Sequence, residues 1–116
     1  MLRDNYTRVA EVQKIVDGDT IDVLVYCGFR RYSSERLRLA RINTPEVRGE
    51  ERERGLVSKT FVEHALPLGS RIVFTSLNED AFGRWLSEVI YLDENGNECN
   101  LSDDLLANGL AELYIR

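Results

Sequence analysis

Three short segments of the sequence carry side chains that could act together on a phosphate group. Asp17-Gly18-Asp19-Thr20 places two carboxylates on one turn, and Asn43-Thr44-Pro45-Glu46 offers amide, backbone carbonyl and carboxylate oxygens. Gly83-Arg84 adds an arginine after a flexible glycine. Hard cations such as Ca²⁺ bind several oxygen ligands, and arginine can hold a phosphate through two hydrogen bonds. These residue types indicate an anion site beside a metal ion.

The residues before the second of these turns have the pattern of a strand. Leu37 and Leu39 share one face, and Arg36 and Arg38 share the other, with the period of two that is typical of a half-buried strand. Pro45 then ends the strand, because it has no N–H to donate and favours an extended residue before it. The pattern predicts a cationic strand face that runs into the oxygen-rich turn.

Each segment also has a simpler interpretation. Asp17-Gly18-Asp19-Thr20 is typical of an ordinary hairpin turn, in which Gly18 is expected to adopt a positive φ. Thr44-Pro45-Glu46 also occurs as a plain turn or at the start of a helix, and Gly83-Arg84 carries little information alone. From the residues alone, the sequence predicts a β-rich domain with a site for an anion or a metal ion.

Other residues that could carry chemistry have structural interpretations. His64, the single histidine, is expected on the polar side of a helix without a catalytic role. Tyr26, Tyr32 and Tyr91 are interpreted as packing or strand residues and not as platforms for base stacking.

Length and composition predict one globular domain over residues 1–116, since 43% of the residues are hydrophobic. The sequence has no apolar run of about 18 residues, the length that spans a bilayer. The first residues lack the apolar core of an export signal, so the expected location is the cytoplasm, with no membrane partner. Cys27 and Cys99 match no zinc-binding spacing and are expected to be free, buried or semi-buried thiols.

Charge is distributed unevenly along the chain. The net charge of −5 argues against indiscriminate binding to nucleic acid. Eight arginines nevertheless lie between Arg30 and Arg54, and acidic residues dominate between Glu79 and Asp104. A local basic surface on an acidic protein indicates a focused anion site, although solvated charges on both faces would give the same counts.

The order of predicted elements favours a β-rich α+β domain, a five-stranded OB-fold Greek-key barrel. A helix is inserted between the third and fourth strands, and a short helix follows the fifth. The predicted strands are Tyr6–Val16, with a bulge near Ile15-Val16, then Ile21–Tyr26, Glu35–Ile42, Arg71–Ser76 and Trp85–Leu92; the helices are Glu53–Leu66 and Ser102–Ala107, with a mobile loop over Val47–Arg54 and an edge strand over Ala111–Ile115.

Taken together and in order, four motifs resemble the staphylococcal nuclease (thermonuclease) family. The likeness spans roughly Val9 to Tyr114. The motifs are Val16-Asp17-Gly18-Asp19-Thr20, then Arg38-Leu39 leading into Asn43-Thr44-Pro45-Glu46, then Phe82-Gly83-Arg84, and finally Asn108-Gly109-Leu110-Ala111.

The resemblance implies a Ca²⁺-dependent phosphodiesterase that cleaves DNA and RNA on an OB-fold. Asp19 matches the family's carboxylate ligand of calcium, and Thr44 matches the residue that binds it through a backbone carbonyl. Asn43 stands where the family usually has a second aspartate. The loss of one negative charge implies weaker Ca²⁺ binding, and other divalent metals become candidates.

The resemblance also assigns the catalytic groups. Glu46 matches the carboxylate that positions the attacking water and is often proposed to deprotonate it. Arg38 and Arg84 match the arginines that contact the scissile phosphate. Phe82 replaces the usual tyrosine and keeps a stacking face for the substrate.

The implied partner is nucleic acid, single-stranded more than duplex, and the sequence identifies no protein partner. Two further features depart from the family: Ala81 replaces a common lysine, and the sequence ends at Arg116, where the family usually continues into a last helix. The first alternative to an active nuclease is a weak or inactive nucleic-acid-binding module on the same fold. The second is a structural or protein-interaction domain in which these segments are ordinary turns.

Overall fold

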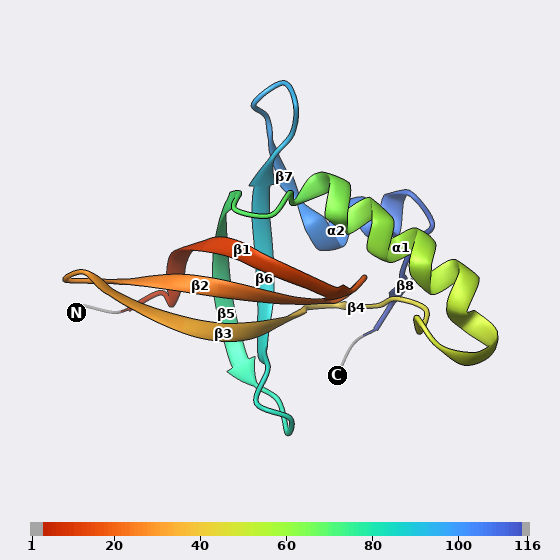
Figure 1. Cartoon of the computed structure of the whole chain (residues 1–116), viewed down its shortest axis with the longest axis horizontal. Helices are drawn as coiled ribbons and strands as arrows, with labels where there is room; N and C mark the ends of the chain where they lie inside the picture. Colours follow the sequence, from red (N-terminus) through yellow and green to blue (C-terminus); the bar gives the residue numbers. More distant parts are fainter. Residues whose placement is uncertain (1–3, 115–116) are drawn as a thin grey trace.

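The computed structural model of the protein describes residues 4–114. Long curved strands cross a second, steeper pair of strands, and both helices lie toward one end of the molecule (Figure 1). The elements in chain order are β1 (Thr7–Asp17), β2 (Thr20–Gly28), β3 (Arg31–Leu39), β4 (Ile42–Asn43), a 3-10 turn (Gly49–Glu51), α1 (Arg52–Ala65), β5 (Arg71–Glu79), β6 (Trp85–Leu92), β7 (Glu98–Asn100), α2 (Leu101–Ala107) and β8 (Glu112–Leu113).

Five strands close into a barrel. Their order is β3-β2-β1-β5-β6, each pair antiparallel, and β7 extends the free edge of β6. Parallel pairing of β3 with β6 closes the ring, with Leu37 opposite Trp85 and Leu39 opposite Ser87. The barrel is therefore mixed, and the predicted five-stranded OB-fold with two helices is confirmed.

Alternating residues of the strands fill the barrel. β1 has register shifts at Val12/Lys14 and Ile15/Asp17, which confirms the predicted bulge near Ile15. Helix α1 closes one end through the buried Val62, and Leu66 follows it. The largest fully buried side chains are Ile21, Leu37, Leu39, Ile42, Leu66, Ile72, Leu101, Leu105, Val12, Val23, Val62 and Val89.

The predicted strand Glu35–Ile42 was wrong at both ends. β3 begins at Arg31, four residues before the predicted start at Glu35, and ends at Leu39. The chain then turns at Arg41, which has a φ of 70°. Strand pairing explains the break, because Leu39 is the last residue that pairs with β6, whereas Ile42 pairs with Leu113 of β8.

Other differences are smaller. β7 was not predicted, and a 3-10 turn occupies part of the segment that was expected to be a mobile loop. The C-terminal strand is shorter than Ala111–Ile115, and Ile115 lies outside the described residues. Cys27 is exposed and Cys99 half-buried, and both thiols are free, so the expected burial of Cys27 was wrong. Within residues 4–114, the helices are too short or too polar to cross a bilayer.

The corner between β3 and β4 is held by charges from two other elements. Arg41 donates to Glu88 of β6 over 2.7 and 2.8 Å and lies 2.9 Å from Asp103 of α2. The hydroxyl of Ser102 also donates to the carbonyl of Ala40 over 2.9 Å. These contacts fix the turn that leads from β3 to Asn43 and Thr44.

Helix α1 lies directly against the residues that follow β4, and Gly55 makes this approach possible. A Cβ atom at Gly55 would lie 2.1 Å from the carbonyl oxygen of Glu46 and 2.8 Å from that of Pro45. Both obstructing atoms belong to the backbone, so the helix and the loop would have to separate.

Gly55→Ala is therefore expected to lower the free energy of unfolding, although alanine is the better helix former. Overpacking costs about 1–3 kcal/mol, against a gain of about 1 kcal/mol in helix propensity. Thr60→Ala on the exposed face of the same helix is the control and should be neutral or slightly stabilising. Urea denaturation measures both, and equal stability of the two variants would contradict the close approach.

Candidate active site

The turn between β1 and β2 carries the first two acidic residues of the site. The N–H of Asp19 donates to the Asp17 carboxylate over 3.1 Å. Gly18 does not adopt the predicted positive φ. Its lack of a side chain serves a different purpose, since a Cβ atom there would lie 2.9 Å from side-chain atoms of Ser58 and Thr44. Glycine thus lets this turn contact α1 and the segment after β4.

Asp19 joins the turn to that segment. Its side chain is buried, and one carboxylate oxygen accepts from the Thr20 hydroxyl over 3.1 Å. The other oxygen accepts from the backbone N–H of Thr44 over 3.1 Å. The Asp19 carboxylate therefore fixes the backbone of Thr44 beside the β1–β2 turn.

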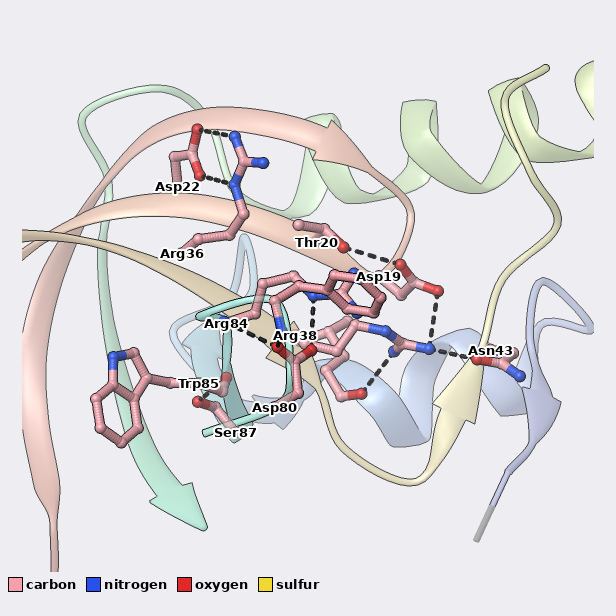
Figure 2. A network of polar contacts seen from close by, with 12 residues as sticks. Asp19, Thr20, Asp22, Arg36, Arg38, Asn43, Asp80, Arg84, Trp85 and Ser87 are labelled. Atoms are coloured by element: carbon pink, nitrogen blue, oxygen red, sulfur yellow. Dashed lines mark hydrogen bonds and ion pairs between the residues drawn. The ribbon is translucent and has the colours of Figure 1, made fainter. Parts of the chain in front are cut away.

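Arg38 lies at the centre of the site and not on an open cationic face (Figure 2). It is only 5% exposed. One terminal nitrogen donates to the carbonyls of Leu39 and Ile42 over 2.8 and 3.0 Å. The other lies 3.3 Å from the Asp19 carboxylate and donates to the side-chain oxygen of Asn43. Charge pairing and carbonyl acceptors make its burial tolerable.

Arg36 shows what the strand pattern predicted correctly. It lies two residues before Arg38, forms a 2.6 Å ion pair with Asp22 and remains largely in water. The same alternation predicts the same face for both arginines. Only the β3–β4 turn, which folds carbonyls and Asn43 around Arg38, distinguishes them.

Arg84 approaches the site from the β5–β6 turn and is held by Asp80. Its Nε donates to the Asp80 carboxylate over 2.7 Å, and its N–H donates to the same carboxylate over 2.9 Å. The guanidinium lies 5.3 Å from the centre of the Phe82 ring. Asp80 was not predicted as a site residue. An aspartate that bonds the backbone two residues later is a recognisable turn signal.

A pocket of about 640 Å³ brings these segments together. Six of the seven predicted residues line it, and only the exposed Phe82 does not. Exposed Glu46 lies at its wall, and its side chain forms no hydrogen bond within residues 4–114. The lining residues are Asp17, Asp19, Arg38, Asn43, Thr44, Pro45, Glu46, Glu51, Arg54, Val57, Ser58, Arg84, Gly109, Leu110, Ala111 and Glu112.

Several lining residues were not predicted to take part. The predicted motif Asn108–Ala111 contributes its last three residues, and the hydroxyl of Ser58 anchors it by donating to the Leu110 carbonyl over 2.6 Å. Glu51 comes from the 3-10 turn before α1, Arg54 comes from α1, and Glu112 comes from β8. Their spacing in the sequence gives no signal, because only the fold brings them to the pocket.

The two aspartates of the first turn titrate differently. Burial raises the pKa of Asp17, and the neighbouring Asp19 carboxylate raises it further. Burial also opposes ionisation of Asp19, but its contacts with Asp17, Arg38 and Thr44 together hold its pKa below the ordinary value. The pair thus confines negative charge in a small buried volume.

The pocket as a whole has a formal excess of negative charge. Five acidic residues and three arginines line it. A phosphate would meet this negative wall unless a cation were also present. The donor types fit a hard cation, since carboxylates, an amide and a backbone carbonyl all offer oxygen. Within residues 4–114, no three His, Cys, Asp or Glu side chains form a ready metal cluster, so carbonyl, amide and water oxygens would complete the set.

Arg38→Met is expected to lower the free energy of unfolding by about 3 kcal/mol or more, because it leaves Asp19 buried beside unpaired carbonyls. Arg36→Met, the same change two residues earlier, removes an exposed ion pair and should cost at most about 1 kcal/mol. Equal losses in denaturant unfolding would contradict the structural role of Arg38.

Comparison with known proteins adds one finding. The profile of the family described as staphylococcal nuclease homologue matches residues 36–116, which contain Arg38, Asn43, Thr44, Glu46 and Arg84. No curated protein matches the chain. The match covers 81 of 116 residues and coincides with the part of the barrel that carries most of the pocket. The chain therefore belongs to the staphylococcal nuclease homologue family.

Proposed function

We propose that the protein is a divalent-cation-dependent phosphodiesterase that hydrolyses DNA or RNA, with single strands preferred to duplex. One observation carries the proposal: Asp19, Arg38, Glu46 and Arg84, from separate segments of the chain, line one pocket. Family membership supports nucleic acid as the substrate. An arginine pair beside oxygen ligands and a water-exposed carboxylate suits hydrolysis of a phosphate ester.

The cation would be held by Asp19, Asn43 and the carbonyl of Thr44. Ca²⁺ is the first candidate because all of these donors are oxygens, and Asp17 supplies a second carboxylate on the same turn. When bound, the cation would offset the negative wall and neutralise charge on the phosphate oxygens.

The two arginines have different tasks. Arg38 is buried and orders the loop around Asn43, so it presents a fixed charge to one side of the pocket. Arg84 uses Nε for Asp80, and its two terminal nitrogens form no hydrogen bond within the described residues. These nitrogens can bind phosphate oxygens and stabilise the charge that develops during attack.

Glu46 is the proposed proton acceptor. Its carboxylate is exposed at the pocket wall, while its backbone is held against Gly55 of α1. A carboxylate in this position can orient a water molecule and accept its proton as the oxygen attacks phosphorus.

Glu46→Gln and Arg84→Ala are expected to lower kcat by roughly 100-fold or more, the usual effect of losing a general base or a charge-stabilising donor. The measurement is release of acid-soluble nucleotides from single-stranded DNA with Ca²⁺. Glu50→Gln, which changes an exposed carboxylate outside the pocket, is the control and should retain full activity. Wild-type rates in either pocket variant would contradict the assigned roles, and activity in excess chelator would contradict the metal requirement.

Asn43 motivates a second candidate function, a module that binds nucleic acid without cleaving it. Its side-chain oxygen already accepts from Arg38 and brings no negative charge to the cation. Asn43→Asp should tighten Ca²⁺ binding by roughly tenfold and raise the cleavage rate at limiting Ca²⁺. Asn95→Asp adds the same charge on an exposed turn outside the pocket and should change neither. If the wild-type protein and the Asn43→Asp variant both bind the oligonucleotide at saturating metal and neither cleaves it, the result would favour the binding module.

A further inference from the structure

The hairpin between β2 and β3 ends in a turn whose residues do not contribute to the core of the barrel. Phe29 and Arg30 form a two-residue loop with φ values of 54° and 62°, and Gly28 and Arg31 pair on either side of it. Positive φ at both positions is the geometry of a type I′ turn, which favours Asn-Gly. A bulky aromatic and an arginine are strained there, and such outliers cluster at functional positions.

The turn presents aromatic and cationic groups to solvent. Phe29 is 94% exposed and Tyr32 is 61% exposed. The rings of Tyr26 and Tyr32 lie with their centres 5.5 Å apart, so these tyrosines form an exposed pair and do not fill the core. The side chains of Arg30 and Arg31 form no hydrogen bond or ion pair within residues 4–114. We call residues 26–32 the hairpin tip.

The hairpin tip differs in charge from the rest of the protein. Residues 26–32 contain three aromatic residues and two arginines but no acidic residue, in a chain of net charge −5. A ligand for this surface should combine negative charge with flat apolar groups. Single-stranded nucleic acid has both, because its phosphates pair with arginine and its unpaired bases stack on aromatic rings.

The β2–β3 turn and strand β4 lie at opposite ends of β3 (Figure 1). Asn43 of β4 and Arg38 near the end of β3 line the pocket. Pairing is continuous from Tyr26 opposite Tyr32 to Thr20 opposite Arg38. Because side chains alternate, Tyr32, Ser34, Arg36 and Arg38 share one face of β3 over about 20 Å. This face thus forms a path from the aromatic pair to the buried arginine of the pocket.

We infer that the hairpin tip is a second contact for a single-stranded nucleic acid whose scissile phosphate occupies the pocket. The inference rests on the proposed function for its choice of ligand. An OB-fold commonly covers about 4–16 nucleotides of single strand, which is enough to bridge the two ends of β3. The tip would bind the nucleic acid through base stacking and through ion pairs with phosphates, without recognising its sequence.

The double variant Phe29→Asn/Arg30→Gly tests this inference without endangering the fold. It replaces the loop by the residues that a type I′ turn prefers, so the Tm should stay the same or rise. The Kd for a fluorescent oligothymidylate of about 16 nucleotides, measured by anisotropy in excess chelator, should rise roughly tenfold. The slope of log Kd against log salt should fall by about 0.7 for one lost phosphate contact.

Two controls test whether the change in the oligonucleotide Kd is specific to the hairpin tip. A thymidine bisphosphate, which reaches only the pocket, should stabilise both proteins equally in thermal unfolding with Ca²⁺. Leu92→Asn removes an exposed apolar side chain from the end of β6 and should leave the oligonucleotide Kd unchanged.

An unchanged Kd for the long oligonucleotide would overturn the inference, as would an equal loss of bisphosphate binding. Binding of the tip to anionic phospholipid vesicles, with no effect on the oligonucleotide, would assign it to a membrane surface instead and also overturn it. Absence of cleavage together with tip-dependent binding would contradict only the proposed function. If the double variant cleaves and binds the oligonucleotide as the wild-type protein does, the result would contradict only the inferred role of the hairpin tip.

Discussion

The buried guanidinium of Arg38 is the interaction on which the site depends. It contacts the last carbonyl of β3, the carbonyl of Ile42 in β4, the amide of Asn43 and the carboxylate of Asp19. One side chain thus connects three stretches of backbone that would otherwise be free to separate. A buried charge with several acceptors stabilises only the arrangement that satisfies all of them, so Arg38 also specifies the geometry of the pocket.

The pocket combines a rigid half with an open half. Asp19, Arg38 and Thr44 are joined by hydrogen bonds and the ion pair, and the barrel surrounds them. Glu46 and Phe82 are exposed, and Arg84 is anchored through one nitrogen on a turn. This division suits phosphoryl chemistry, in which fixed charges define where the phosphate binds and more accessible groups meet water and the leaving strand.

Sequence reasoning could predict the elements that depend on local patterns. Strands β1, β2 and β6 and helix α1 were predicted from residues that are local in the sequence, and the order of motifs led to the correct family. It could not predict that Arg38 is buried while Arg36 is exposed, because the difference comes from the β3–β4 turn. It also gave the wrong reason for Gly18, whose constraint is the proximity of Ser58 and Thr44 in space. The short strand β4 was not predicted as a separate element, because it exists only through its pairing with β8 across the chain.

That last pairing has a consequence for how the protein is made. Asn43, a proposed ligand, pairs with Glu112, and the N–H of Tyr114 donates to the carbonyl of Arg41 over 2.7 Å. A domain folds as a unit, so the pocket wall cannot be completed until residues near 112 have been synthesised. The nascent protein would therefore lack a complete pocket wall until the residues of β8 are available to pair with β4.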